Sequence, residues 1–504
     1  MRVLVTGGTG VVGTGAVTAL LANGHQVRLL SRHAERDARQ WPTGVEPWPG
    51  EVSDAASIGG AADGCDALLH LVAIVDESPP DATFQRVNVD GTRHIVAEAA
   101  RAGVRRLVYV SSLGADRGES PYHRSKLAGE EIVRGYAGDW LVIRPGNVYG
   151  PGDEQVSLLL RMVRTLPVVP VFGGGDQPFA PIWHEDLAAA LARAVDRADL
   201  VARTLEIAGP DVTTQSDLLD RLQRLTDRSP LRVPLPEFVA SAGMKAMGLA
   251  GLDAPLGESQ LTMIREGNVL RDDAVNALES VLGVAPTPLD RGLALLADAQ
   301  AEQTPREGVG ALKRKRYWAD IQRSRLGPDQ LMEYLRTHFG EMMPGFVGVA
   351  VEPGTPETLD LDETLTLSLP LRGHVQVRVA ELEDRRLTLV TLEGHPLAGA
   401  VRFITSYEGE AVRFEISVYD RAANVVDMLL MRTLGDFMQN RTWESLAEAA
   451  IRASGGEAPA GVHHESDTLE GPDARSIEEW ADALVARRKR AVNAEEVADA
   501  RTEV

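Results

Sequence analysis

The chain has 504 residues, of which 44% are hydrophobic and 25% are charged, and these values exclude a wholly disordered or fibrous protein. Its 73 acidic residues outnumber the 52 basic ones, and the net charge of −21 makes generic binding to nucleic acid or anionic lipid unfavourable. At about 100–200 residues per domain, the length predicts roughly three domains, although two large ones would also fit.

The chain has one cysteine, Cys65, which excludes an intrachain disulfide and a cysteine-based zinc site, and we assign no metal site. The first residues lack the basic segment of a signal peptide. The longest apolar runs, such as 67–75, are far shorter than the about 20 residues that span a bilayer. We therefore expect a cytoplasmic protein with no membrane span.

In the first 150 residues, short apolar runs alternate with helical patterns. The runs predict strands at 3–6, 26–31, 67–73, 107–111 and 141–144, and helices at 11–23 and 87–102. Strands that alternate with helices indicate βαβ units. The near-continuous apolarity of the strands fits burial on both faces. The fold class expected here is α/β, with a doubly wound parallel sheet.

From residue 151 to about 299 the pattern continues more loosely, with helices expected at 158–166, 183–198 and 218–226. His184, Glu185 and Asp186 open the second of these helices, where acidic residues suit the helix dipole, so we interpret them as capping rather than metal-binding. The stretch 230–255 is rich in Pro, Gly and Met and predicts a mobile lid or a hydrophobic surface.

Residues 301–324 are polar and contain the basic run Lys313-Arg314-Lys315-Arg316, which we interpret as a solvated interdomain connector. Beyond it, strands are expected at 364–369, 374–381, 387–392, 400–407 and 411–419, followed by a long helix at 421–453. Because no helix-sized gaps separate these strands, the sheet should be antiparallel. We therefore predict an α+β domain at 325–453 and, at 454–504, a charged, flexible tail with a helix capped by Ser476.

The strongest signal is a glycine-rich segment, Thr6-Gly7-Gly8-Thr9-Gly10-Val11-Val12-Gly13, placed where a strand ends and a helix begins. Gly7 permits a tight turn, Gly10 lets the backbone approach a pyrophosphate, and Gly13 allows close helix–strand packing. The free N–H groups of the helix N-terminus would then hold the phosphates. A glycine-rich turn without a ligand is the alternative.

The second expected strand ends in Ser31-Arg32-His33, where NAD-specific proteins usually place an acidic residue for the ribose 2′-hydroxyl. A cation there suits a 2′-phosphate, so Arg32, perhaps joined by Arg36, favours NADP(H) over NAD(H). Stacking of Arg32 on adenine is the alternative interpretation.

Further motifs follow in a fixed order: Asp66 to Ala73, Asn88-Val89-Asp90-Gly91-Thr92, Val110-Ser111-Ser112, Tyr122-His123-Arg124-Ser125-Lys126 and Arg144 to Gly150. With the glycine-rich segment they resemble the short-chain dehydrogenase/reductase superfamily, in its extended or atypical branch. That branch includes epimerase/dehydratase-like and complex-I-accessory-subunit-like proteins. The resemblance covers about residues 1–300 and implies a Rossmann sheet with a small substrate subdomain.

The resemblance implies a catalytic set of Tyr122, Lys126 and Ser112. Tyr122 would be the general acid or base toward a carbonyl or hydroxyl group. Lys126 lies one helical turn further on the same face, and its ammonium would lower the phenol pKa. Ser112 would hydrogen-bond the substrate oxygen.

The same resemblance implies which residues contact the cofactor. Val72 and Ala73 would pass under the ribose, Asn88 would brace that region, and Pro145 to Val148 would meet the nicotinamide end. The full cofactor set is Gly7, Thr9, Gly10, Val11, Val12, Gly13, Arg32, Glu51, Val52, Val72, Ala73, Asn88, Ser111, Pro145, Asn147 and Val148.

Two features depart from the family pattern. Glu51-Val52 replaces the Asp-containing pair that usually meets the adenine. Only nine residues separate Ser112 from Tyr122, which leaves a short loop where the substrate would lie. This loop argues against a nucleotide-sugar substrate and favours a small or apolar one.

The segment from Leu392 to Gly399, Arg402-Phe403 and Phe414-Glu415-Ile416, followed by the long helix, is similar to an uncharacterised bacterial domain family related to START-like helix-grip proteins. This resemblance implies a sheet wrapped around one helix, often with an apolar cavity, and leaves open whether that cavity is packed or binds a ligand.

Three functions follow from these features. The first is an NAD(P)-dependent oxidoreductase acting on an unknown carbonyl or alcohol. The second is a non-catalytic NADP(H)-binding sensor or scaffold. The third is a hydrophobic-ligand-binding protein acting through the C-terminal domain. A homo-oligomer is compatible with all three.

Overall fold

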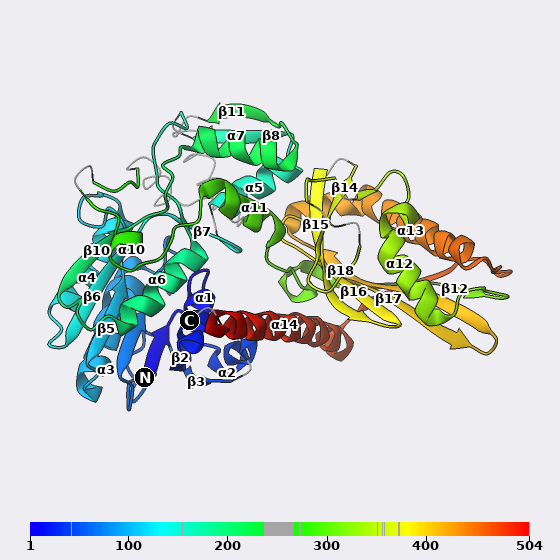
Figure 1. The fold of residues 1–504 in the computed structure, drawn as a ribbon. Coiled ribbons are helices and arrows are strands. Elements are labelled where there is room, and N and C mark those ends of the chain that lie inside the picture. Colours follow the sequence, from blue (N-terminus) through cyan, green and yellow to red (C-terminus); the bar gives the residue numbers. More distant parts are fainter. Residues whose placement is uncertain are drawn as a thin grey trace.

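A computed structural model describes residues 1–41, 43–153, 155–172, 174–235, 267–271, 274–349, 351–354, 356, 358–370 and 373–502. Two sheets dominate it, a parallel one in the first part of the chain and an antiparallel one in the second (Figure 1). Most of the expected lid at 230–255 falls outside the described residues.

The first sheet is parallel throughout and has the strand order β10-β6-β5-β4-β1-β2-β3. Its strands are β1 (Arg2–Thr6), β2 (Gln26–Ser31), β3 (Val45–Pro49), β4 (Ala67–His70), β5 (Arg106–Val110), β6 (Asp139–Pro145) and β10 (Arg203–Ile207). Successive strands are added on one side of β1 up to β3 and on its other side from β4 onward. A doubly wound sheet binds its ligands at this switch point, between β1 and β4. The predicted α/β class is confirmed.

Helices cover both faces of this sheet. Buried apolar residues of α1 (Gly13–Ala22) and α6 (His184–Asp196) form one core with the inner strands. On the other face, α3 (Gly91–Ala102) and α4 (Pro121–Arg134) pack in a second core. The short helix α2 (Ala34–Asp37), with η1 (Ala38–Gln40) after it, follows β2, and η2 (Gln85–Asp90) leads into α3.

A smaller unit with its own apolar core stands above the carboxyl ends of the strands. It contains β7 (Val148–Tyr149), α5 (Val156–Thr165), β8 (Val168–Phe172), β9 (Ile182–Trp183), α7 (Gln215–Thr226), β11 (Leu231–Leu235) and α11 (Leu289–Asp298). The short helix α10 (Ala277–Ser280) instead packs beside β10, in the core of the parallel sheet. α5 and α7 pack against each other and frame a cavity described below.

The second sheet is antiparallel, in the order β13-β14-β15-β16-β17-β18-β12-β19, as the sequence predicted for its central strands. These strands are β12 (Val309–Ile321), β13 (Gly348–Val349), β14 (Thr364–Leu369), β15 (Gly373–Glu383), β16 (Arg386–Thr391), β17 (Leu397–Glu408), β18 (Ala411–Ala422) and β19 (His463–Leu469). The long helix α13 (Val425–Ser454) and α12 (Pro328–Met342) pack on one face of the sheet.

Two expectations about the second half are wrong. The basic run at 313–316 is not a solvated connector, because it lies in β12, where the Arg314 guanidinium bonds Asp467 at 2.6 Å. The segment after α13 is not a loose tail, because β19 pairs with β12, and α14 (Gly471–Thr502) begins five residues before Ser476. On one face of β12, Arg314 and Arg316 pair with acidic residues of neighbouring strands. Lys315 is buried on the other face together with Tyr317 and Ile321.

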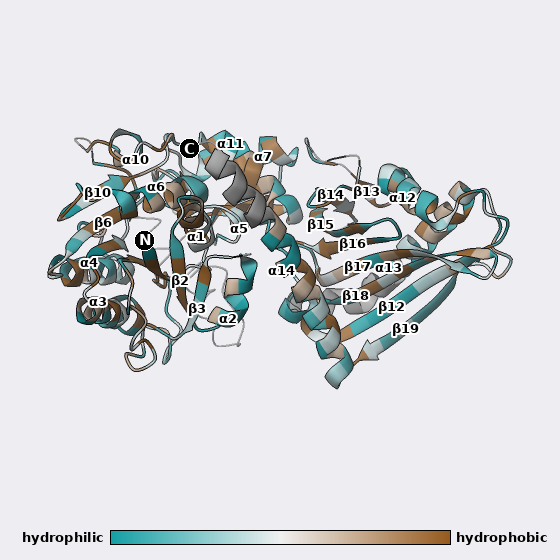
Figure 2. Ribbon diagram, turned by 60° about the horizontal axis from the view of Figure 1, so that its bottom comes forward, coloured by the Kyte–Doolittle hydropathy of each residue, from teal (hydrophilic) through white to brown (hydrophobic). Residues whose placement is uncertain are grey.

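α14 lies between the two parts and contacts α1, η1 and β15 (Figures 1 and 2). The two parts also meet at α5, where Arg164 donates to both Glu352 carboxylate oxygens at 2.8 and 2.6 Å and to the Gln376 side chain at 2.8 Å. None of the helices in the described ranges is both long and apolar enough to cross a bilayer.

Candidate active site

The glycine-rich turn between β1 and α1 has the geometry that the sequence predicted for two of its glycines. Gly7 has φ of +74°, a left-handed conformation that other residues rarely adopt. A Cβ on Gly13 would lie 2.1 Å from the Gly7 carbonyl oxygen and 2.6 Å from the Gly8 backbone, so only glycine lets α1 start this close to the turn.

Gly10 differs from these two glycines, because a Cβ there would meet nothing closer than the Gly7 oxygen at 3.6 Å. Gly10 and Thr9 are exposed at the tip of the turn. No contact within the protein therefore requires glycine at position 10. A bound group that approaches the backbone at this point would explain why a side chain is absent there.

The start of α1 is suited to an anion. Its N-cap residue, Val12, makes no side-chain capping bond, and the first turn holds no acidic residue. Uncapped N–H groups and the helix dipole favour phosphate at this end. The turn and the helix start therefore fit the diphosphate of a dinucleotide, with Val11, Val12 and Gly13 supplying backbone.

Several predicted ribose and adenine contacts lie around this turn. A Cβ on Gly7 would touch the Val72 nitrogen at 3.0 Å, so Val72 and the following Ala73 continue the floor of the site. Asn88 braces this segment through two bonds to the Ile74 backbone, of 2.8 and 3.0 Å, and also donates to Ser125 at 2.9 Å.

The other two predicted adenine contacts have roles within the protein. The Glu51 carboxylate accepts from Ser53 at 2.5 Å. Val52 is buried and packs against Gly91, where a Cβ would lie 2.9 Å from Cγ2 of Val52.

Arg32 is exposed just past the end of β2. An acidic group lies close by, since the buried Asp37 accepts from the Ser31 hydroxyl at 2.5 Å and from Arg36 at 3.0 Å. Arg36 pairs with that carboxylate but stays largely exposed, so Arg32 and Arg36 both present cations to solvent at this corner.

Tyr122 and Ser112 come together at the carboxyl end of β5. Tyr122 is in the first turn of α4, which Ser120 caps by accepting from the His123 N–H. Burial raises the pKa of the Tyr122 phenol, and the neighbouring Ser112 hydroxyl offsets part of this rise.

Lys126 lies one turn further along α4 and is almost fully buried. Its ammonium donates to the Val110 carbonyl at 2.7 Å and sits 4.7 Å from the centre of the Tyr109 ring. Burial lowers the pKa of Lys126 to about 7, against the opposing effect of Glu130. The sequence analysis expected Lys126 to lower the pKa of the Tyr122 phenol. In the protein alone this pKa is raised instead, because burial has the larger effect on Tyr122.

Ser111 takes part in a network of hydrogen bonds within the protein. Its hydroxyl donates to the fully buried Glu130 at 2.6 Å, and Arg144 makes two bonds of 2.8 Å to the same carboxylate. Arg144 also bonds Asp116 at 2.7 Å. This network ties β5, α4 and β6 together, and the cofactor contact expected of Ser111 stays a prediction.

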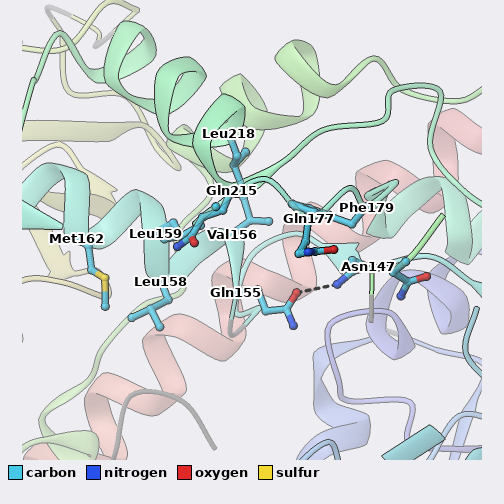
Figure 3. Close-up of a pocket in the computed structure, with 13 residues that line it drawn as sticks. Asn147, Gln155, Val156, Leu158, Leu159, Met162, Gln177, Phe179, Gln215 and Leu218 are labelled. Carbon is cyan, nitrogen blue, oxygen red and sulfur yellow. Dashed lines mark hydrogen bonds between the residues drawn. The ribbon is translucent and has the colours of Figure 1, made fainter. Parts of the chain in front are cut away.

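The nicotinamide-end residues border a cavity. Pro145 ends β6 and Val148 begins β7, with Asn147 between them. The Asn147 amide donates to Gln155 at 2.9 Å, and Asn147 lines the cavity (Figure 3). The cavity holds about 790 Å³ of space, part of it open to solvent. Its described lining is Asn147, Gln155, Val156, Leu158, Leu159, Met162, Gly175, Gln177, Phe179, Gln215, Leu218, Gly267 and Asn268.

The lining contains apolar and amide side chains and no charged residue among those described. The Oδ1 atoms of Asn147 and Asn268 are buried without a hydrogen-bond partner in this part of the structure. Leaving such buried amide oxygens unpaired costs stability.

His184 is a site residue that the sequence analysis did not assign. Burial lowers the pKa of its imidazole, and the neighbouring Val11 backbone of the glycine-rich turn offsets part of this lowering. A Cβ on Gly150 would lie 2.2 Å from the same ring, so Gly150 leaves room for His184. In the sequence, His184 with Glu185 and Asp186 resembled the start of a helix, and nothing there indicated a contact with the glycine-rich turn. No group of three or more His, Cys, Asp or Glu residues suited to a metal occurs in the described segments.

Comparison with known proteins places these features in a family. Residues 3–208 match the model of the NAD dependent epimerase/dehydratase family. Sterol demethylase protein B of Methylococcus capsulatus is 33% identical over 261 residues, which are 47% of this chain and 78% of that protein.

Two further relatives match shorter shares of their own length. Ceramide reductase of Caulobacter vibrioides is 35% identical over 190 residues, 38% of this chain and 59% of that protein. The mitochondrial NADH dehydrogenase [ubiquinone] 1 alpha subcomplex subunit 9 of Rattus norvegicus is 28% identical over 241 residues, 48% of this chain and 63% of that protein. The predicted resemblance to epimerase/dehydratase-like proteins and to complex-I-accessory-subunit-like proteins is confirmed. The START-like resemblance of the second half stays a prediction.

Proposed function

Because the chain belongs to the NAD dependent epimerase/dehydratase family, we propose that it is an NADP(H)-dependent oxidoreductase that acts on the carbonyl or alcohol group of an apolar small molecule. The observation that carries this proposal is the placement of the Tyr122 phenol beside the Ser112 hydroxyl, at the same edge of the sheet as the open glycine-rich turn. In a doubly wound sheet this edge is where the cofactor and substrate meet.

The glycine-rich turn holds the cofactor diphosphate through the backbone of α1, and Arg32 holds the 2′-phosphate that distinguishes NADP(H) from NAD(H). The bound cofactor supplies the hydride. Asn88 keeps the Val72–Ile74 segment in place beneath the cofactor through its bonds to Ile74.

Tyr122 supplies the proton. Because burial raises the pKa of its phenol, Tyr122 stays protonated at neutral pH and is suited to donate to a carbonyl oxygen. This protonation state favours the reduction direction. Ser112 bonds both the phenol and the substrate oxygen, which orients the proton transfer.

Lys126 acts on this step through its charge. The Val110 carbonyl fixes its ammonium, and a pKa of about 7 leaves roughly half the molecules protonated at neutral pH. A protonated Lys126 stabilises the phenolate that Tyr122 leaves after donating its proton.

The cavity beyond Asn147 defines the substrate class. A nucleotide sugar carries a diphosphate that needs cations, and the described lining offers none. An apolar skeleton suits Leu158, Leu159 and Met162, while the amides meet one or two polar groups (Figure 3). The names of the relatives, a ceramide reductase and a sterol demethylase protein, support a lipid-like substrate.

The test is the Tyr122→Phe variant, assayed for NADPH oxidation against a sterol ketone, a long-chain ketone and UDP-glucose, with exposed Tyr407→Phe as the matched control. We expect wild type and Tyr407→Phe to reduce an apolar ketone, and Tyr122→Phe to lose about 10²–10⁴-fold in kcat while its Kd for NADPH is unchanged. Unaltered turnover by Tyr122→Phe would remove the phenol from the mechanism. NADPH binding without turnover across the panel would support the non-catalytic sensor instead.

A further inference from the structure

The helix α5 has two faces with different neighbours. Leu158, Leu159 and Met162 line the cavity that we propose for the substrate (Figure 3). Arg161 and Arg164 share the opposite face, because residues three apart lie on one side of a helix, and both approach the second domain. One wall of the substrate cavity is therefore also a contact surface between the two parts of the chain.

Arg164 anchors the last turn of α5 to the second domain. Its guanidinium donates to both carboxylate oxygens of Glu352, at 2.8 and 2.6 Å, and to the Gln376 side chain at 2.8 Å. It also donates to the Ala297 carbonyl at 2.9 Å, and the Gln376 amide donates to the same carbonyl at 2.8 Å. His374 lies 3.3 Å from the Glu352 carboxylate. The Arg164 and Glu352 side chains are 4% and 5% exposed, so this pair escapes the solvent screening that weakens surface ion pairs.

Two glycines of the second domain make room for α5. Gly373, at the start of β15, has φ of +68°, and a Cβ there would lie 2.2 Å from the Arg164 carbonyl oxygen. Gly394 has φ of +92°, and a Cβ there would lie 2.8 Å from Cγ of Arg161. The backbone of the second domain thus comes as close to α5 as glycine permits. This close approach and the bonds of Arg164 together fix the position of the helix.

We propose that the second domain positions α5 and thereby sets the affinity of the cavity for its substrate, with Arg164 and Glu352 as positioning residues. This inference rests on the proposed function, because it takes the cavity beside α5 as the substrate site. The glycine-rich turn, Ser112 and Tyr122 do not belong to α5, so cofactor binding should not depend on the buried pair.

The test compares wild type with Glu352→Gln, which keeps the size of the side chain and removes its charge. Glu383→Gln, which removes an exposed carboxylate paired with Arg386, is the matched control. In NADPH-dependent reduction of 2-undecanone, we expect Glu352→Gln to raise KM about fivefold or more, with kcat and the Kd for NADPH within about twofold of wild type. The control should leave all three constants unchanged.

A second readout does not require turnover. The ¹³C-labelled methyl group of Met162, assigned by its loss in Met162→Leu, reports on the cavity side of α5. Glu352→Gln should shift this signal in the absence of any ligand, whereas Glu383→Gln should not. If wild type reduces no ketone, the proposed function fails, and the Met162 signal still decides whether the second domain positions α5.

An unchanged Met162 signal in Glu352→Gln would overturn the proposal, as would an unchanged KM where turnover is measurable. Either result would hold even if the variant melts at a lower temperature, because the pair would then serve stability alone. If Glu352→Gln does not fold, Gln376→Leu takes its place, since it removes an uncharged partner of the same guanidinium and should change both readouts in the same direction.

Discussion

Two glycines in the same turn allow cofactor binding to be separated from folding. We predict that Gly10→Ala and Gly13→Ala have opposite effects on stability but the same effect on NADPH affinity. Gly10 has no left-handed φ, and its new Cβ would lie 3.6 Å from the nearest atom, an ordinary contact. Gly10→Ala should therefore leave the free energy of unfolding unchanged or raise it by about 0.4–1 kcal/mol.

The Gly13 position gives the opposite result. Its Cβ would lie 2.1 Å from the Gly7 oxygen, and the backbone atoms involved must move by more than an ångström to restore an ordinary contact near 3.4 Å. Overpacking of this kind typically costs about 1–3 kcal/mol. Gly13→Ala should lower the free energy of unfolding by that amount and displace the start of α1.

Urea denaturation and calorimetric titration with NADPH measure the two effects. For Gly10→Ala we expect wild-type stability with a Kd raised at least about tenfold, because the methyl group occupies the space left for the diphosphate. A Gly10→Ala protein that binds NADPH as tightly as wild type would show that the turn does not receive the diphosphate, and would refute the reasoning.

Three more predictions follow from single contacts. Arg32→Ala should raise the Kd for NADPH about tenfold and leave that for NADH unchanged; equal effects on both would contradict the 2′-phosphate assignment. Arg164→Met should cost up to about 3–5 kcal/mol in urea denaturation, because the buried Glu352 loses both Arg164 bonds and keeps the weaker contact with His374, and Arg164→Met/Glu352→Met should recover most of it; a single-variant cost under about 1 kcal/mol would argue against the buried pair. Burial lowers the pKa of Lys126 to about 7 in the folded state, so between pH 7 and about 10 the unfolded chain holds a proton that the folded one lacks. The wild type should therefore gain stability relative to Lys126→Met as pH rises through this range, and a constant difference would contradict the low pKa.

The parallel sheet and the glycine-rich turn could be predicted because their signals are local. The run Val3 to Thr6, followed by closely spaced glycines, specifies a strand, a turn and a helix without reference to distant residues. The antiparallel strands of the second domain were visible for the same reason, in alternations such as Val375, Val377 and Val379.

The misjudged segments depend on partners far away in the chain. β12 resembled a connector because Lys313 to Arg316 are all basic, and partners far away in the chain, such as Asp467 and Glu415 on neighbouring strands, make that run favourable in a sheet. Edge strand β3, with Pro47 and Pro49, gave no strand pattern at all.

The site shows the same division between local and distant signals. The bond between Asn88 and the Ile74 backbone matched the role that the family resemblance implies for Asn88. The contact of His184 with the glycine-rich turn joins residues more than 170 positions apart, and no spacing in the sequence could reveal it. The bond of the Ser111 hydroxyl to the buried Glu130 was not predicted either.

The proposed function requires a dinucleotide seated at the turn between β1 and α1. Isothermal titration of the full chain with NADPH and then NADH tests this directly. We expect saturable binding of one NADPH per chain, tighter than that of NADH. Heats indistinguishable from dilution for both dinucleotides, with the protein folded by circular dichroism, would contradict it.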